Sequence, residues 1–541
     1  MLTLRFTSDL ARHKILSMVD LQLVVSWASA LTIGWSIYGV ISFLQRRSHG
    51  SQFRQQRAPW VPYWLPWIKH TMQAALTIDH MHDWTTELCE QYQGKPFRIG
   101  AVGQPDFTVI STPELFEDVL KTQFDSFDKG EKMNEALRDV LGRGIFAVDG
   151  HEWLRQRKTG SNLFTARSLR DSMSRTIQDL LPVLHRVLNR AAASGDAINL
   201  SSILQKFTLD AFTRIGFGCE FGCLDAATEH PFEAAFENAQ RILTIRLFTP
   251  AIWWKTLRFL NIGVERELKE HIKVIDHTIF DIISRSIQAR QQSHDGASSK
   301  NIVSLFIDNA SNMSDEAGEG KDSSIETSLL RDIVVNFLIA GRDTSAQVLS
   351  WLFVELTLHP EIEDRIRDEL RAKLPHLFTS SDCVAPSAEQ VQRLPYLEAV
   401  IKETLRLHPS VPINSRRAVR DTVLSDGTFI AAGEFVAMPT YALGRMTHVW
   451  GPDAREFRPE RWLDQTSPTG LITVSAFKFN SFHAGPRMCL GMNLAMLEMK
   501  TLAASVLSKF QLRVDAADRV TYDVALTLPI RGPLSTHIHR L

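Results

Sequence analysis

The sequence predicts a mainly helical fold with small β-sheets, placed behind an N-terminal transmembrane helix. Long stretches such as "RDSMSRTIQDLLPVLHRVLNRAAA" and "IEDRIRDELRAKL" carry apolar residues at three- and four-residue spacing, which is typical of helices with one buried face. The signals for strands are short and lie far apart along the chain. Near the N-terminus, an apolar run without charged residues is long enough to cross a lipid bilayer.

The predicted transmembrane helix covers residues 21–44, between an N-terminal segment (1–20) and a linker (45–67). As a helix, the run would be about 36 Å long, which exceeds the roughly 30 Å of a hydrocarbon core. A cleaved signal peptide is the alternative, because Ala28–Ala30 has the small-residue form of a cleavage site. The apolar run continues well past that site, which favours an uncleaved anchor. Basic residues flank both ends, and the positive-inside rule favours a cytosolic position for the rest of the chain.

The linker is basic at its start and ends in "APWVPYWLPW". Prolines stiffen such a segment, and tryptophan side chains suit a membrane interface; packing on the following domain is the alternative. Residues 68–541 are predicted to form one large domain without internal repeats. Its strand signals are "PFRIGAVGQPDFTVIS" and "TVLSDGTFIAAGEFVAMP", the second with Asp426–Gly427 as a hairpin turn.

Composition limits the possible functions of this domain. The chain has 541 residues, of which 44% are hydrophobic, and a formal net charge of −1. Its charge provides no general positive field for nucleic acid. The cysteines number five, an odd and sparse set that predicts a reducing compartment rather than a disulfide framework. Cys219 and Cys223 are close together, but no second ligand pair follows at zinc spacing, so they are expected to be small buried hydrophobes.

The stretch "FNSFHAGPRMCLGMNLAMLEMK" places a single cysteine, Cys489, in a glycine-containing loop before a predicted helix. A thiol nucleophile would need a base, for which His483 is the nearby candidate. A zinc site would need further ligands, and none cluster near this cysteine in the sequence. A haem-thiolate site needs only one protein sulfur, because the porphyrin supplies four nitrogen ligands to the iron.

In the haem-thiolate interpretation, the residues around Cys489 have specific roles. A helix that starts at Leu490 would direct its N-terminal amides at the sulfur and stabilise the thiolate. Glycines let the backbone approach a flat ring, a guanidinium can pair with a haem propionate, and an aromatic ring can pack beneath the macrocycle. The residues that suit these roles are Gly485, Gly491, Arg487 and Phe482.

A second motif, "NFLIAGRDTSAQVLSW", is predicted to be a buried helix whose polar residues have a functional role. Gly341, Asp343 and Thr344 would be unfavourable inside an ordinary core helix. The Thr344 hydroxyl can bond back to the carbonyl of Ala340 and open the helix ladder locally, which would make a groove for O2 and a water molecule.

These motifs together resemble those of the cytochrome P450 family. The haem-binding signature appears as Phe482-x-x-Gly485-x-Arg487-x-Cys489-x-Gly491, and the oxygen-activating helix as Ala340-Gly341-x-Asp343-Thr344. "KETLRLHP", "FRPERW" and "HEWLRQRK" resemble three further family motifs and occur in the family's order. The resemblance extends over about residues 60–541 and implies the P450 fold, with 68–541 as the catalytic domain.

The resemblance also implies roles for individual residues. Cys489 would be the axial ligand of the iron in heme b (iron protoporphyrin IX). Thr344 would hold the hydrogen-bond network at the bound oxygen, and Asp343 would relay protons. A buried triad would support the haem loop, and three residues besides Arg487 would bind propionates. The triad maps onto Glu403, Arg406 and Arg461, beside Trp462 where many members have Phe, and the propionate-binding residues map onto Trp153, Arg157 and Arg416, with Arg417 as the alternative to Arg416.

The implied activity is that of a monooxygenase that uses O2. Electrons would come from NADPH through a separate NADPH–cytochrome P450 reductase, because the chain ends soon after Cys489. Several stretches resemble the branch that includes fatty-acid omega-hydroxylases, and "RILTIRLFTPAIWWKTLRFL" could line a lipid entry path at the membrane; an ordinary packed helix and loop is the alternative. We therefore expect a lipid substrate, most readily a fatty acid, and a single-pass protein of the endoplasmic reticulum membrane with a cytosolic catalytic domain. The alternatives are a P450-fold hydroperoxide isomerase or dehydratase, and a haem protein that only senses ligands.

Overall fold

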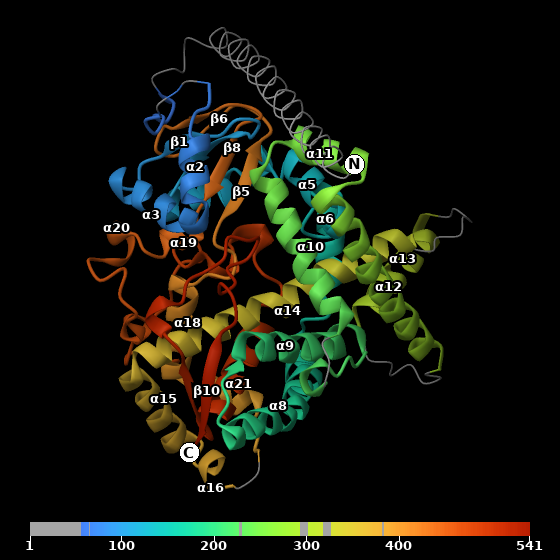
Figure 1. Ribbon diagram of the computed structural model, residues 1–541, viewed down its shortest axis with the longest axis vertical. Helices are drawn as coiled ribbons and strands as arrows, with labels where there is room; N and C mark the ends of the chain where they lie inside the picture. Colours follow the sequence, from blue (N-terminus) through green and yellow to red (C-terminus); the bar gives the residue numbers. More distant parts are fainter. Residues whose placement is uncertain are drawn as a thin grey trace, which may run out of the picture.

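The computed structural model describes residues 56–63, 65, 67–226, 230–292, 301–317, 326–380 and 383–541. The predicted transmembrane segment, residues 21–44, lies outside this part of the chain. Among the described residues, no helix has both the length and the apolar character that a membrane span requires. The described residues form a mainly helical body with small sheets, as the sequence predicts (Figure 1).

The centre of the molecule is the helix α14 (Thr327–Leu358), which packs along α9 (Leu200–Phe217) (Figure 1). Around them lie α8 (Ser174–Ser194), α18 (Pro395–Leu407) and α21 (Met492–Leu507). The other α-helices of the described residues are α2 (Thr71–Thr77), α3 (Met81–Gln91), α4 (Pro113–Glu117), α5 (Glu131–Leu141), α6 (Gly150–Ser161), α7 (Ala166–Ser168), α10 (Pro231–Phe248), α11 (Ala251–Leu260), α12 (Gly263–Gln292), α13 (Ile302–Ala317), α15 (Pro360–Lys373), α16 (His376–Thr379), α17 (Ala388–Gln392), α19 (Thr440–Leu443) and α20 (Thr447–Trp450).

The largest sheet has the order β1-β2-β8-β5-β3, with β2 and β8 parallel and the other neighbours antiparallel. Its strands are β1 (Phe97–Gly100), β2 (Asp106–Val109), β3 (Phe127–Asp128), β5 (Asn414–Ala418) and β8 (Phe435–Met438). A second sheet joins β4 (Ile198–Asn199), β10 (Ser535–Arg540) and β9 (Phe510–Val514). The predicted hairpin at Asp426–Gly427 is confirmed, since it links β6 (Thr422–Val423) to β7 (Phe429–Ile430) and Gly427 has φ +87°.

The end of the predicted linker is already part of the domain. Val61 is buried against the large sheet, its amide donates to the carbonyl of Arg98 at 3.0 Å, and the Arg98 amide donates to Pro59. The Trp60 ring lies 4.7 Å from the Arg98 guanidinium, so this tryptophan packs on the domain. The domain therefore begins before residue 68, because these residues extend the edge of the sheet.

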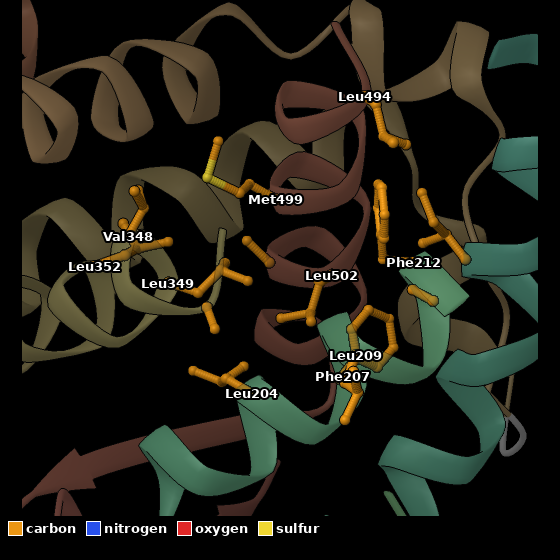
Figure 2. Close-up of a cluster of buried hydrophobic side chains, with 14 of the residues drawn as sticks. Leu204, Phe207, Leu209, Phe212, Val348, Leu349, Leu352, Leu494, Met499 and Leu502 are labelled. Atoms are coloured by element: carbon orange, nitrogen blue, oxygen red, sulfur yellow. The ribbon is translucent and has the colours of Figure 1, made fainter. Parts of the chain in front are cut away.

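The main core joins α9, α14 and α21 (Figure 2). Its side chains are fully or almost fully buried and include Leu204, Phe207, Leu209, Val348, Leu349, Leu352, Met499 and Leu502. Interiors of this kind are close-packed and resist sliding of one helix past another. The core therefore fixes α14, which carries Thr344, relative to α21, which follows Cys489.

Gly341 is required by the packing of α14 on α9. A Cβ atom at this position would lie 2.1 Å from the ring of Phe212, which is a buried core residue. The glycine that is unfavourable for a helix in isolation thus allows a close helix–helix approach. Cys219 and Cys223 are both buried in the same core, in agreement with their predicted role as small hydrophobes.

Candidate active site

A cavity of about 1160 Å³ lies beside α14, beyond the usual range of roughly 300–1,000 Å³ for ligand pockets. It brings together residues that are far apart in the sequence. Of the predicted site residues, the cavity is lined by Trp153, Arg157, Gly341, Thr344, Arg416, Phe482, Arg487, Cys489 and Gly491. Its remaining wall comes mainly from α2, α3, α5, α10, β1 and β2.

Backbone geometry fixes the loop that carries Cys489. The Cys489 amide donates to the carbonyl of Phe482 at 2.9 Å and closes the loop. Gly485 has φ +64°, and a Cβ atom there would lie 2.1 Å from the carbonyl oxygen of Leu120. The sequence predicts that Gly485 allows approach to a flat ring, whereas the structure shows it at a tight contact with a neighbouring backbone.

The surface that Cys489 exposes faces the cavity. Burial in the protein raises the pKa of its thiol, while a hydrogen bond from the backbone of Gly491 and the charge of Arg157 act in the opposite direction. Helix α21 starts at Met492, two residues later than predicted, with Gly491 at its N-cap. The protein alone therefore favours the thiol, and a bound metal cation would be needed to make the thiolate the stable form.

His483 cannot serve as the base for a thiol nucleophile. Its Nε2 accepts a hydrogen bond from Arg416 at 3.1 Å, and its Nδ1 lies against the backbone of Ala484. Burial and the charge of Arg416 lower the pKa of His483 to about 3. Because both ring nitrogens have partners other than Cys489, the nucleophile interpretation lacks its base.

The cavity wall near Cys489 carries crowded positive charge. Burial, and then repulsion by Arg487, lower the pKa of Arg416 to about 10. Burial and the charges of Arg416 and Arg487 also hold the pKa of Lys129 well below its usual value. A nearby carboxylate, Asp149, pairs with Arg487. The donor set thus fits an anionic group of more than one charge beside the thiol, as the two propionates of haem would provide.

Trp153 and Arg157 occupy one face of α6, as predicted from their spacing. The Trp153 ring is buried and contacts two guanidinium groups, with Arg487 at 4.4 Å and Arg157 at 5.9 Å from its centroid. A ring in this position holds both cations at the cavity wall through cation–π attraction.

The choice between Arg416 and Arg417 follows from strand β5. Successive residues of a strand point to opposite faces. Arg417 pairs with Asp128 on the neighbouring strand, with Nη2 to Oδ2 at 2.5 Å, whereas Arg416 lines the cavity. Arg416 is therefore the residue available to an anion in the cavity.

Lys129 is a cavity residue that sequence reasoning missed. It precedes Gly130, whose φ of +83° turns the chain into α5, and its amide donates to Asp149 Oδ2 at 3.0 Å. It belongs to none of the motifs, so only its three-dimensional neighbours reveal it.

On α14, the predicted back-bond of Thr344 is present. Its Oγ1 donates to the carbonyl of Ala340 at 2.8 Å, and its own carbonyl accepts a hydrogen bond from Ser410 Oγ at 2.9 Å. The helix nevertheless continues without interruption through this turn. A threonine hydroxyl can share the carbonyl without breaking the ladder, so the predicted local opening is absent.

Asp343 is buried and turned toward α10 rather than lining the cavity. One carboxylate oxygen accepts from Arg342 at 2.9 Å and the other from Gln240 at 2.7 Å. Arg342 also pairs with the half-exposed Glu237 at 2.9 Å. Because Gln240 does line the cavity, it connects Asp343 to the cavity, a role that no sequence motif indicates.

The predicted triad is assembled around Glu403, whose side chain is fully buried. Arg406 makes two hydrogen bonds to it, both at 2.7 Å, and Arg461 makes one at 2.8 Å. The indole N–H of Trp462 also donates to Glu403, at 2.9 Å. Tryptophan therefore supplies a hydrogen bond that a phenylalanine at this position could not make.

The triad helix α18 contacts the cysteine loop directly. Ser481 Oγ donates to the carbonyl of Leu405 at 2.7 Å. Arg406 additionally donates to the carbonyls of Gly444, Ala454 and Glu456, which ties α18 to the chain segment that lies between this helix and the cysteine loop in the sequence. Burial of Glu403 and its partners thus determines where the loop that carries Cys489 lies.

Comparison with known proteins agrees with this site. Residues 59–531 match the sequence model of the family described as Cytochrome P450. Cytochrome P450 86B1 of Arabidopsis thaliana is 34% identical over 500 residues, covering 90% of this chain and 86% of that protein. Cytochrome P450 CYP94D108 of Paris polyphylla is 36% identical over 436 residues, covering 80% and 83% respectively. Cytochrome P450 monooxygenase cyp1 of Mycosarcoma maydis is 34% identical over 413 residues, covering 75% and 62%.

Proposed function

The chain belongs to the cytochrome P450 family, and on that premise we propose that it hydroxylates long-chain lipids, with fatty acids as the first substrates to test. As a family member it is a haem monooxygenase that takes NADPH-derived electrons from a reductase and acts with O2 on a lipophilic substrate. The proposal adds the class of lipid, the site residues and the membrane location.

Haem would be held by Cys489 as the ligand of its iron and by a cationic wall for its propionates. The wall consists of Arg157, Arg416, Arg487 and Lys129. When bound, thiolate-ligated haem supplies O2 activation and the insertion of one oxygen atom into a C–H bond. Thr344 lies in the cavity wall where its hydroxyl can hold hydrogen bonds at the reacting end of the substrate.

The observation that carries the lipid assignment is the apolar wall of the large cavity. Away from the cationic end, side chains of α5 and α10 such as Leu137, Val140, Leu243 and Leu247 line it. A wall of this kind favours a long hydrocarbon chain, because binding removes apolar surface from water. The sequence resemblance to the omega-hydroxylase branch supports the same substrate class.

Exposed apolar residues near the cavity support a membrane location. On α11, the exposed fractions are 65% for Ile252, 60% for Trp253 and 88% for Phe259, and α2 exposes 74% of Leu76. Figure 1 places α2 and α11 at the same end of the molecule. The α11 cations Lys255 and Arg258 are also half-exposed, which suits the headgroup region of a bilayer. We propose that this end rests on the endoplasmic reticulum membrane, with residues 21–44 as anchor and the catalytic domain in the cytosol, where NADPH–cytochrome P450 reductase would donate electrons.

The test is a carbon-monoxide difference spectrum followed by turnover of a lipid panel with NADPH and purified reductase. We expect hydroxylated products from fatty acids and a strict requirement for O2 and NADPH. Isomerisation or dehydration of lipid hydroperoxides without NADPH would instead identify the isomerase alternative. Ligand binding without NADPH consumption would identify a haem sensor.

Asp343 is expected to control proton delivery to Thr344. Asp343→Asn should lower kcat on the order of 10²-fold, because a positioned acid–base group contributes about that factor, with little change in substrate affinity. Gln240→Met should act in the same direction through loss of the 2.7 Å bond to Asp343, and should raise the solvent isotope effect. Glu237→Gln, at the half-exposed end of the same network, is the matched control and should change turnover least. Unchanged turnover and coupling in Asp343→Asn would remove the proton role.

A further inference from the structure

The charges in the cavity wall are strongly segregated. Among the described residues that line it, the lysines and arginines are Lys129, Arg157, Arg416 and Arg487. Electrostatic contacts join them to one another and to Cys489, so they form a single cluster at the thiol end. If haem occupies that end, its propionates use these cations, and they are not available to a substrate carboxylate.

The rest of the lining is neutral. Both ring nitrogens of His70 contact backbone groups of Val61 and Gly100, and burial lowers the pKa of His70, so it is neutral near pH 7. Burial also lowers the pKa of His82 to about 4 and raises that of Glu498 to about 8, which leaves both uncharged.

Several neutral polar side chains in this wall are already bonded to the protein. Asn336 Nδ2 donates to the carbonyl of Leu141 at 2.8 Å, and its Oδ1 accepts from the Phe146 amide at 3.0 Å. Ser410 donates to the carbonyl of Thr344, and Gln240 donates to the carboxylate of Asp343. A carboxylate drawn into this region would therefore be a buried charge without a counter-charge, which is a costly arrangement.

We place the mouth of the cavity between α2 and the connection from α10 to α11, because its lining residues Ala75 and Phe248 are exposed there. Across this mouth, Gln104 Nε2 donates to the carbonyl of Thr249 at 2.7 Å. The residues at this mouth are close in sequence to the exposed Leu76 and Ile252. A lipid headgroup at the mouth would therefore lie beside the exposed apolar residues of α2 and α11, which are proposed to face the membrane.

From this charge distribution we infer that the pocket selects its substrate by the hydrocarbon chain and not by an anionic headgroup. Fatty acids, fatty alcohols and fatty-acid esters of one chain length then bind alike, with the chain inside and the headgroup at the mouth beside Gln104. The inference rests on the proposed function, because it assumes that a long-chain lipid enters the cavity with its far end toward Cys489.

The first experiment compares dodecanoic acid, 1-dodecanol and methyl dodecanoate with the haem-loaded full chain. Binding is measured from the substrate-induced change of the haem absorption spectrum, independently of turnover. The three dissociation constants are expected to agree within about threefold. A specific interaction between the protein and the carboxylate would make the dissociation constant of the acid about tenfold lower than those of the other two lipids. A preference of tenfold or more for the acid overturns the inference alone. Failure of all three lipids to bind overturns the proposed function and the inference with it.

The second experiment adds a cation at the mouth. Gln104→Arg should tighten binding of the acid by about tenfold relative to the alcohol, because a partly exposed counter-charge now faces the headgroup. Gln104→Met is the matched control, since both variants lose the hydrogen bond to Thr249. The control should bind acid and alcohol equally. If Gln104→Arg leaves the acid-to-alcohol ratio unchanged, the headgroup does not lie at this mouth and the inference is wrong.

Discussion

Cys489→Ala is expected to abolish the red-shifted absorption band of the reduced carbon-monoxide complex and all monooxygenase turnover. Among the described residues that line the cavity, Cys489 is the only cysteine, so no second thiolate can replace it there. Thiolate ligation provides the electron density that favours O–O cleavage, and alanine offers no ligand. The measurement is the carbon-monoxide difference spectrum, together with the amount of haem that remains bound after desalting.

Cys383→Ala is the appropriate control for this variant. Cys383 is half-buried, its sulfur contacts Ser505 Oγ at 3.9 Å, and it does not line the cavity. Its replacement should leave the spectrum unchanged. Because the cationic wall is intact in Cys489→Ala, some haem could stay bound, and its band would then lie at the position typical of weak or nitrogen ligation. A band at the thiolate position in Cys489→Ala would show that another residue ligates the iron.

The parts of the site that were predictable from the sequence are those that depend on short-range spacing. Trp153 and Arg157 are four residues apart, so a helix places them on one face wherever it packs. The Thr344 bond to Ala340 likewise follows from one turn of helix. The choice between Arg416 and Arg417 could not be made in this way. Adjacent strand residues face opposite sides, and only pairing with β3 shows which side is the cavity.

The residues that were missed act through contacts between distant segments. Lys129 meets Arg416 and Arg487 only after β3 and β5 pair, and Gln240 meets Asp343 only after α10 packs beside α14. Neither residue carries a local pattern that distinguishes it from an ordinary surface residue. The requirement for glycine at position 341 also depends on tertiary packing, because the side chain that leaves no room for a Cβ atom there is Phe212 of another helix. Tertiary packing supplied information that spacing within one helix or strand does not contain.

Glu403→Gln is expected to destabilise the domain and to release haem. The variant removes the negative charge that compensates the buried Arg406 guanidinium, whose other partners are backbone carbonyls. Breaking one partner of a buried pair destabilises by roughly 3–5 kcal/mol, because it leaves an uncompensated charge. Arg461 is affected less, since it retains Asp453 at 3.3 Å. Chemical denaturation followed by haem absorbance and by tryptophan fluorescence measures both consequences.

Two neighbouring variants separate the effect of the charge from general disturbance of the region. Trp462→Phe removes a single hydrogen bond to the carboxylate, worth about 1.5–3 kcal/mol for a charged acceptor, and should lie between wild type and Glu403→Gln. Arg458→Ala removes an exposed side chain but keeps the backbone N–H that donates to Glu403 at 2.8 Å, so it should match wild type. Should Glu403→Gln instead match Arg458→Ala in stability and haem retention, the position of the cysteine loop would not depend on this carboxylate. The graded order of the three variants is therefore the signature of a buried charge that holds the ligand loop in place.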